Sequence, residues 1–297
     1  MVTRAIRDAT TLEAWFPHVA LGKESSPEEL PPVTASALDE ERRVARELVT
    51  LTIDLDAAPA DVADAYLRLH LLSLQLVAPH GLNLDGIFGL LPTVARTQIG
   101  SVHVDDVLDL MLKRRLAGQP LSIDSVDKFP RLTDFVLPPA VRIADAARVR
   151  LGAHLAPGTV VMHEGFVNFN AGSLGKSMIE GRITQGTVVE AGADIGAGSS
   201  TMGTLSGGGE HRVRIGEGSL LGANAGVGIS LGRDCAVEAG LYVTRGTIVS
   251  LPDGSHVKAQ ELSGQDYLLF RRNSRTGLVE ALPWKSKSFV ALNAALH

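Results

Sequence analysis

The sequence predicts a mainly β protein in which a parallel β-helix follows an N-terminal α/β domain and precedes a short C-terminal extension. An aliphatic residue recurs every six positions after residue 140, and a small residue stands four positions after each. Glycine is abundant, with 31 residues, whereas aromatic residues make up only 4%. This spacing suits short strands joined by tight corners, because aliphatic side chains point inward and small residues fit where two walls meet. Three walls of about six residues each complete one coil, and stacked coils share one core.

The six-residue period is carried by twelve segments, interrupted at two places. The register slips between Ser173 and Arg182, and a glycine-rich insertion covers 205–211. So many segments in phase would not arise by chance, although the period leaves the handedness of the coil open, and general crossover preference favours a right-handed one. The hexads begin at Ile143, Val149, Leu155, Val161, Val167, Ile183, Val189, Ile195, Ile215, Leu221, Val237 and Val243.

We place the α/β domain at 1–135, the β-helix at 136–254 and the extension at 255–297. Helices are predicted over 36–49, which opens with a serine cap and an acidic first turn, and over 60–76, where apolar residues follow helical spacing. A third helix is predicted over 104–116, amphipathic and basic at its end. Pro138 and Pro139 then mark a boundary, since neither continues a helix or donates to a sheet.

Composition excludes several classes of partner. The net charge is -5 with no block of like charge, which argues against nucleic acid or an anionic membrane. Cys235 is the single cysteine, so no internal disulfide is possible, as expected in a reducing cytoplasm. No signal peptide is evident, and charged residues interrupt the most apolar region, 66–94. We expect a soluble cytoplasmic protein whose tail, with six basic and three acidic residues, forms a local basic surface.

Six segments stand out in the second half: MHEGFVNFNAG (162–172), MIEGRI (178–183), MGTLSGGG (202–209), LLGANAGVGISLG (220–232), VEAGLYVT (237–244) and LLFRRNS (268–274). They resemble the tetrahydrodipicolinate N-succinyltransferase family, most of all its actinobacterial branch. The resemblance is close from residue 140 onward and looser before it. It implies a left-handed parallel β-helix of hexapeptide repeats and a homotrimer with ligand grooves between neighbouring coils. The implied reaction moves succinyl from succinyl-CoA to the amino group of ring-opened tetrahydrodipicolinate, a dicarboxylate amine acceptor, in lysine and diaminopimelate biosynthesis.

The resemblance makes Glu180, the glutamate of MIEGRI, the catalytic carboxylate, proposed in the family to attack the thioester and form an acyl anhydride. A general base that takes the proton of the attacking amine is the other role open to it. Glu180 lies where the hexad register slips, and at such a place a side chain can leave the regular alternation between the inside and the outside of the coil. The alternative is a solvated glutamate at a bulge that has no role in catalysis. Arg182 could hold a carboxylate or thioester carbonyl by a charge-assisted hydrogen bond, or be an ordinary surface arginine.

The same motifs imply a set of CoA-binding residues along the groove. Its members are Arg182, Ala197, Ser200, Ala223, Glu238, Ala239, Gly246, Lys258, Arg271, Arg272, Asn273 and Ser274. Lys258 and the run 271–274 would grip the nucleotide phosphates, a role that suits arginine forks, although two adjacent arginines are also common in a solvated loop. Gly203 would allow the backbone to approach the ligand closely.

The HEG segment provides a metal candidate and a rival base. The resemblance implies that Glu164 lies near the trimer axis, where three copies would repel unless a hard cation such as Mg²⁺ neutralised them. A second acidic ligand would fall at Ala147, with Asp145 nearby, which leaves a second metal site open. His163 is a minor candidate for the general base, since related acyltransferases use histidine.

Three other functions compete with this interpretation. A different acyl-CoA transferase of the same fold would act on a sugar or another amino acid, against which the MIEGRI and LLFRRNS segments count. A metal hydro-lyase needs three histidines that meet, and a scaffold β-helix would leave the basic tail unexplained. Paired ligand spacing is not evident among His154, His163, His211 and His256.

Overall fold

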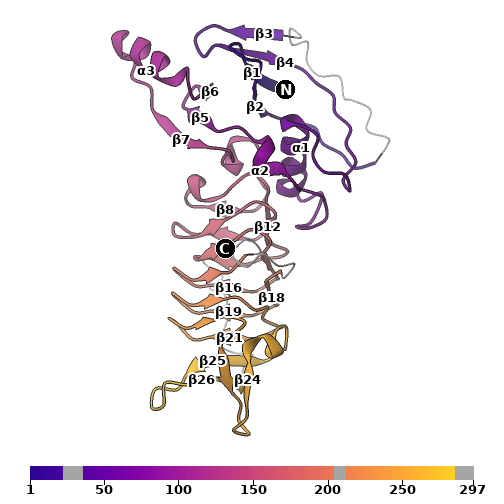
Figure 1. Cartoon of the computed structure of the whole chain (residues 1–297), viewed down its shortest axis with the longest axis vertical. Helices are drawn as coiled ribbons and strands as arrows, with labels where there is room; N and C mark the ends of the chain where they lie inside the picture. The colour runs from indigo at the N-terminus through magenta and orange to yellow at the C-terminus, as the bar shows by residue number, and fades with distance from the viewer. Residues whose placement is uncertain (23–35, 204–211, 285–297) are drawn as a thin grey trace. The chain divides into compact units, whose positions relative to one another are not determined.

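The computed structural model describes residues 1–22, 36–203 and 212–284 in two compact units. The first comprises Met1–Leu71 and Gly81–Pro130, and the second comprises Leu72–His80 and the chain from Arg131 onward. Within the described ranges no helix has both the length and the apolar character needed to cross a bilayer. Each unit has its own strands (Figure 1) and its own buried apolar residues.

The first unit contains two antiparallel sheets and helices α1 (Val62–Ser73), which runs into the second unit, α2 (Ile87–Leu90) and α3 (Val107–Leu116). The four-stranded sheet has the order β2-β1-β4-β3, and the three-stranded sheet has the order β6-β5-β7. Buried apolar residues of α3 pack with those of the three-stranded sheet. The strands are β1 (Val2–Ala5), β2 (Thr11–Ala14), β3 (Ser36–Asp39), β4 (Val44–Glu47), β5 (Val94–Thr97), β6 (Gly100–His103) and β7 (Ile123–Asp127).

The helix predicted over 36–49 is wrong, because this segment forms the β3–β4 hairpin. Strand β4 pairs with both β1 and β3, and Val44 lies fully buried opposite Ala5. Arg42 closes the turn by donating from its backbone N–H (3.0 Å) and its Nε (2.8 Å) to Asp39. The local ladder with β3 and the non-local ladder with β1 together outweigh a weak helix preference. The helices predicted over 60–76 and 104–116 are confirmed as α1 and α3.

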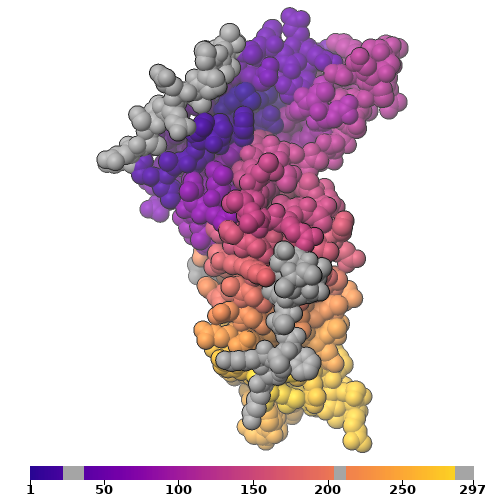
Figure 2. Space-filling view, turned by 180° about the vertical axis from the view of Figure 1, so that it is seen from behind, coloured from indigo at the N-terminus to yellow at the C-terminus, as the bar shows by residue number. Residues whose placement is uncertain are grey.

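The second unit consists of parallel strands that belong in turn to three walls (Figure 1). Because the chain returns to each wall after passing the other two, it forms stacked coils, and Figure 2 shows them following one another in chain order from pink to yellow. Wall 1 contains β8 (Arg142–Ile143), β10 (Val160–Val161), β13 (Met178–Ile179), β16 (Asp194–Ile195), β19 (Leu220–Leu221) and β21 (Ala236–Val237). Wall 2 contains β11 (Phe166–Val167), β14 (Arg182–Ile183), β17 (Ser200–Thr201), β20 (Gly226–Val227) and β22 (Tyr242–Val243). Wall 3 contains β9 (Ala153–Leu155), β12 (Ala171–Ser173), β15 (Val188–Val189) and β18 (Arg214–Ile215).

The aliphatic residues of the hexads form the core between the walls. Val161 stands in register with Ile179 on wall 1, and Val167 stands in register with Ile183 on wall 2, all four fully buried. A continuous column of apolar side chains therefore runs through the coils, and burial of this column stabilises a chain whose strands are only two or three residues long.

The segment after α1 packs with the coils, although it lies far from them in sequence. Ser73 Oγ accepts a hydrogen bond from Gly152 N (2.8 Å), and Gln75 Nε2 donates to Leu155 O (2.6 Å). His80 N donates to the side chain of Asn170 at 2.8 Å. These bonds tie 72–80 to the first coils of wall 3.

Two hairpins close the C-terminal end of the described chain. Strand β25 (Leu268–Arg272) extends wall 1, with Phe270 in register with Val237 and almost fully buried. It pairs antiparallel with β26 (Val279–Pro283), while β23 (Ile248–Ser250) pairs antiparallel with β24 (His256–Lys258). Short 3₁₀ helices cover Leu132–Asp134, Ala146–Arg148 and Ala259–Leu262. The aromatic ring of Phe270 thus covers the end of the apolar column.

Candidate functional site

Several of the predicted site residues lie on one edge of the coils, the corner at which wall 1 turns into wall 2 (the wall 1–2 corner). Coil by coil, this corner carries Glu164, Glu180, Ala197, Ala223 and Ala239. Backbone hydrogen bonds stack the turns directly, from Asn224 N to Ala197 O (2.8 Å) and from Gly240 N to Ala223 O (2.8 Å). Residues far apart in sequence therefore form a continuous line along the fold.

Glu180 lies at a shortened turn of this corner. Only four positions separate Ile179 from Ile183, where six separate most successive core residues. The backbone N–H groups of Glu180 (2.8 Å) and Gly181 (3.0 Å) both donate to Ile195 O, so the regular ladder between the coils is interrupted at this turn. The Glu180 side chain is half-buried and makes no hydrogen bond or ion pair with the residues that the structure describes. Its carboxylate is therefore available to a ligand.

Glycine is required at Gly181 by the next coil. A Cβ atom added there would lie 2.7 Å from Ser199 O and 2.8 Å from Gly196 O, which is too close for any side chain. The tight approach also explains why Arg182 N can donate to Ser199 O at 2.8 Å. Packing of the backbone thus holds the Glu180–Arg182 turn in one position.

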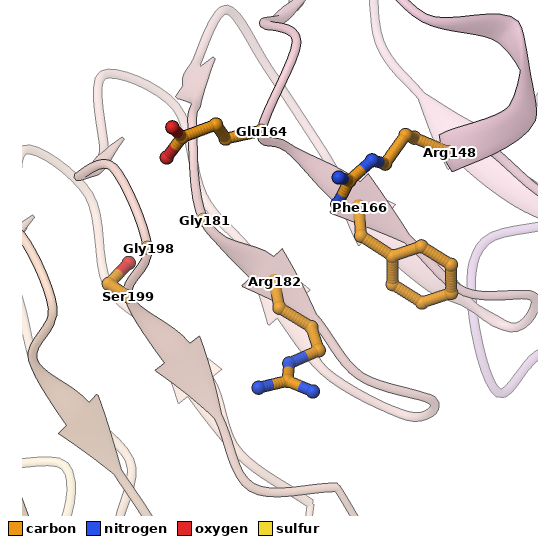
Figure 3. A pocket seen from close by; sticks show the side chains of 7 residues that line it. All are labelled: Arg148, Glu164, Phe166, Gly181, Arg182, Gly198 and Ser199. Atoms are coloured by element: carbon orange, nitrogen blue, oxygen red, sulfur yellow. The ribbon is translucent and has the colours of Figure 1, made fainter.

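A hollow of about 590 Å³ opens along the same corner (Figure 3). It is lined by Arg148, Glu164, Phe166, Gly181, Arg182, Gly198 and Ser199. Figure 3 shows the charged ends of Glu164 and Arg182 pointing away from each other. Arg182 is exposed and its guanidinium has no partner among the described residues, while Arg148 makes only a long contact with Asp145 (3.8 Å). Two guanidinium groups beside an apolar ring can bind a carboxylate.

The strand residues of wall 2 alternate between the core and the outside. The residue immediately before each core position faces outward, which places Phe166, Arg182 and Ser200 on the same outer surface. Ser200 is buried among its neighbours on that surface, and its hydroxyl donates to Thr201 O (3.3 Å). Arg148 precedes the core residue Val149 in the same way, so the period that located the core could also have identified Arg148 and Phe166, which the sequence analysis missed.

Gly246 and Lys258 do not lie on the wall 1–2 corner. Gly246 follows β22 at the opposite end of wall 2, and Lys258 pairs with Ile248 in the β23–β24 hairpin. A hydrogen bond from Ala259 N to Thr247 O (2.8 Å) brings the two positions near each other. They form a second group of predicted CoA-binding residues, separate from the line that includes Glu180.

The basic run 271–274 is joined to the wall 1–2 corner. Arg271 and Arg272 end β25, and the carboxylate of Glu238 accepts a hydrogen bond from Arg272 N at 2.6 Å. Glu238 precedes Ala239 on the last coil of the corner. The line of predicted residues therefore continues from Glu180 through Glu238 to the β25–β26 hairpin, where Asn273 and Ser274 follow.

The histidines that the structure describes do not gather into a metal site. His154 is buried against Val77 O (3.2 Å), and this burial lowers its pKa, so it belongs to the packing of wall 3. His256 lies 3.1 Å from the hydroxyl of Ser250, and His163 is exposed next to Glu164. His211 lies outside the described residues.

The described residues of one copy of the chain do not form a metal site. Within the described ranges, no three acidic, histidine or cysteine side chains gather to hold an ion. Asp145, the acidic residue near the second expected ligand position, accepts a hydrogen bond from Ala147 N (2.9 Å) in its own turn and does not belong to such a group. The residues of one chain therefore do not fit a magnesium site, and the Mg²⁺ prediction rests entirely on three copies of Glu164.

Comparison with known proteins adds evidence independent of this geometry. Residues 91–131 match the family model "Tetrahydrodipicolinate N-succinyltransferase middle", and 212–245 match "Hexapeptide repeat of succinyl-transferase". The 2,3,4,5-tetrahydropyridine-2,6-dicarboxylate N-succinyltransferase of Pseudomonas paraeruginosa is 56% identical over 257 residues, which are 85% of this chain and 74% of the relative. The Pseudomonas putida enzyme of the same name is 55% identical over the same shares.

A solved structure from Campylobacter jejuni supports the same comparison. It is described as a candidate 2,3,4,5-tetrahydropyridine-2-carboxylate N-succinyltransferase, with a TM-score of 0.73 and 37% sequence identity. The match covers 77% of this chain and 64% of the Campylobacter chain, so this chain spans slightly less than two thirds of that protein.

Proposed function

Because the chain belongs to the tetrahydropyridine-2,6-dicarboxylate N-succinyltransferase family, we propose that it moves succinyl from succinyl-CoA to the amino group of ring-opened tetrahydrodipicolinate. This reaction serves lysine and diaminopimelate biosynthesis. The observation that carries the proposal is the line of residues from Glu180 to the basic hairpin. It begins at an unpartnered carboxylate and ends at arginines, as a thioester with a nucleotide at its far end requires.

Glu180 is the proposed catalytic residue. In one role its carboxylate takes the proton of the acceptor amine while the nitrogen attacks the thioester carbonyl, the C–S bond breaks and CoA leaves as the thiolate. In the other role the Glu180 carboxylate attacks the thioester carbonyl, the C–S bond breaks and CoA leaves as the thiolate. The amine then attacks the succinyl carbonyl of the anhydride, the C–O bond to Glu180 breaks and restores the carboxylate, and the proton of the amine passes to the thiolate or to solvent. The Glu180 side chain has no partner among the described residues, and the tightly packed backbone at Gly181 holds the turn in place; both observations support either role.

The CoA arm would follow the wall 1–2 corner. Three coil spacings separate Glu180 from Glu238, or about 14 Å at the usual distance between neighbouring strands. Small residues at Ala197 and Ala223 keep this path clear, and both are exposed or half-buried. The thioester would lie at Glu180 and the phosphates near Arg271 and Arg272.

The dicarboxylate acceptor fits the hollow at the start of the same line. Arg148 and Arg182 provide two guanidinium groups, and each can form paired hydrogen bonds with a carboxylate. The Glu164 carboxylate at the other side of the hollow would repel the carboxylates of the acceptor, so we place the acceptor next to the two arginines. Arg182 lies two residues from Glu180, which would bring the amine near the catalytic carboxylate.

Other features of the resemblance belong to this proposal. They are a left-handed coil, a homotrimer with grooves between neighbouring copies, a cytoplasmic location, Mg²⁺ held by copies of Glu164, membership of the actinobacterial branch, and domain limits at 135 and 254. Absence of nucleic-acid or membrane partners also remains part of the proposal, on grounds of charge alone.

Turnover of succinyl-CoA with tetrahydrodipicolinate tests the proposed function. Glu180→Gln should lower kcat by at least about 10²-fold, the contribution typical of a general acid–base group, while CoA retention stays near that of the wild type. Glu217→Gln is the matched control, because Glu217 is an exposed glutamate at a different corner. Near-normal turnover of the Glu180 variant would remove it from the mechanism and favour His163. Faster turnover with a sugar or another amine than with tetrahydrodipicolinate would favour a different acyl-CoA transferase.

A further inference from the structure

One carboxylate in the β25–β26 hairpin holds two residues of the basic run 271–274. Glu280 stands directly opposite Arg271 in the strand register. Its Oε2 accepts a hydrogen bond from Arg271 Nε (3.1 Å), and its Oε1 accepts one from Asn273 Nδ2 (2.6 Å). The Glu280 side chain is only 17% exposed, against 46% for Arg271, so the carboxylate is the more enclosed partner of this ion pair.

The pairing leaves the phosphate-binding part of Arg271 unused. Only Nε of Arg271 bonds to Glu280, and neither Nη group has a hydrogen-bond partner in the part of the chain that the structure describes, so both can donate to phosphate oxygens. A long arginine side chain loses rotamer freedom when it binds a ligand, and a fixed partner removes that loss in advance. Glu280 thus keeps Arg271 in one orientation before any ligand arrives.

The rest of the hairpin supports the same arrangement. The side-chain oxygen of Asn273 accepts hydrogen bonds from Arg275 N (2.9 Å) and Thr276 N (3.1 Å), which shapes the turn. The hydrogen bond from Asn273 and the ion pair with Arg271 lower the pKa of Glu280, so it is ionised at neutral pH. Asn273 therefore connects Glu280 to the turn.

We propose that Glu280 is a positioning residue that orients Arg271 and the 273–276 turn toward the nucleotide phosphates of CoA. The proposal rests on the proposed function, since it assigns the hairpin to the phosphate end of succinyl-CoA. Glu280 itself does not touch the ligand. Its effect should appear in binding of the nucleotide and not in the chemical step, which takes place at Glu180.

The test compares two succinyl donors, succinyl-CoA and S-succinyl-pantetheine, which lacks the nucleotide. In the full chain, Glu280→Gln should raise KM for succinyl-CoA by about tenfold with kcat within about twofold, as expected when binding common to ground and transition states is lost. With S-succinyl-pantetheine the variant and the wild type should have equal kcat/KM. Glu280→Asp should recover part of the loss, and Glu217→Gln, which breaks a glutamate–arginine pair elsewhere, should leave both donors unaffected.

The outcomes separate this proposal from the proposed function. Equal losses with both donors would show that Glu280 only maintains the fold, and a lower KM for succinyl-CoA would show that its charge merely repels the phosphates; either result overturns the inference. Unchanged kinetics in Glu280→Gln overturns it as well, provided that the wild type prefers succinyl-CoA. A wild type that uses both donors equally would remove the phosphate site from the hairpin, and one that uses neither would overturn the proposed function.

Discussion

Two serines at the same position of two hexads differ in whether their buried hydroxyl groups are hydrogen-bonded, and this difference should affect stability. Ser199 in IGAGSS and Ser219 in IGEGSL are the fifth residues of their hexads, and both are buried. The Ser219 hydroxyl donates to Gly232 O (2.7 Å) and accepts from Cys235 N (2.8 Å). The Ser199 hydroxyl is buried and has no hydrogen-bond partner within the described part of the chain. Replacement of each by alanine should therefore change stability in opposite directions.

A buried polar group without a partner costs about 1–3 kcal/mol. Ser199→Ala removes that group and fits the same space beneath Gly181, so the free energy of unfolding should rise by about 1 kcal/mol. Ser219→Ala removes two hydrogen bonds and leaves a buried carbonyl and a buried N–H unpaired, which should lower the free energy of unfolding by about 2 kcal/mol. The two variants should thus differ by about 3 kcal/mol.

Urea unfolding followed by circular dichroism measures both values, at one fixed protein concentration because association would shift the midpoint. The dependence of the free energy on urea should be the same in all three proteins, since the surface exposed on unfolding hardly changes. A loss of stability in Ser199→Ala similar to that in Ser219→Ala would refute the reasoning, because it would mean that the Ser199 hydroxyl is hydrogen-bonded in the folded protein.

Two further predictions concern the first unit. Burial lowers the pKa of His70 to about 4, against 6.5 for the ordinary group, so the folded state favours neutral His70. The contribution of His70 to the free energy of unfolding is complete above pH 6.5 and is lost as pH falls toward 4, by about 3 kcal/mol in all. Urea titrations from pH 7 to 4 should show that the free energy of unfolding depends less on pH in His70→Gln than in the wild type. The same pH dependence in both proteins would contradict this role of His70. Arg68 is fully buried and donates to Asp64 (2.7 Å) and to the carbonyls of Leu55 and Asn83. Arg68→Met should destabilise the protein by about 3–5 kcal/mol because Asp64 stays buried without its cation, and thermal unfolding that matches the wild type would disprove this.

Local periodicity was sufficient to predict the coils. An inward aliphatic residue and a small corner residue are requirements of one strand and one turn, so positions such as Val161, Val167 and Ile195 could be assigned to the core without knowledge of their neighbours. The slip near Glu180 was visible for the same reason, since a missing pair of residues disturbs a period wherever it occurs. By contrast, the helix predicted over 36–49 is wrong, because β4 in this segment pairs with β1, more than 30 residues away, and with β3 on its other side.

The candidate site depends both on local sequence features and on contacts between distant segments of the chain. The sequence by itself determined that Glu180 occupies an irregular corner and that a basic run follows the coils, because both are local features. Only the tertiary structure decided that Ala197 and Ala223, which are separated by the insertion, stack on one edge, and that Glu280 lies against Arg271. The registers of neighbouring coils and of the hairpin depend on hydrogen bonds between distant strands, and no local pattern specifies such bonds.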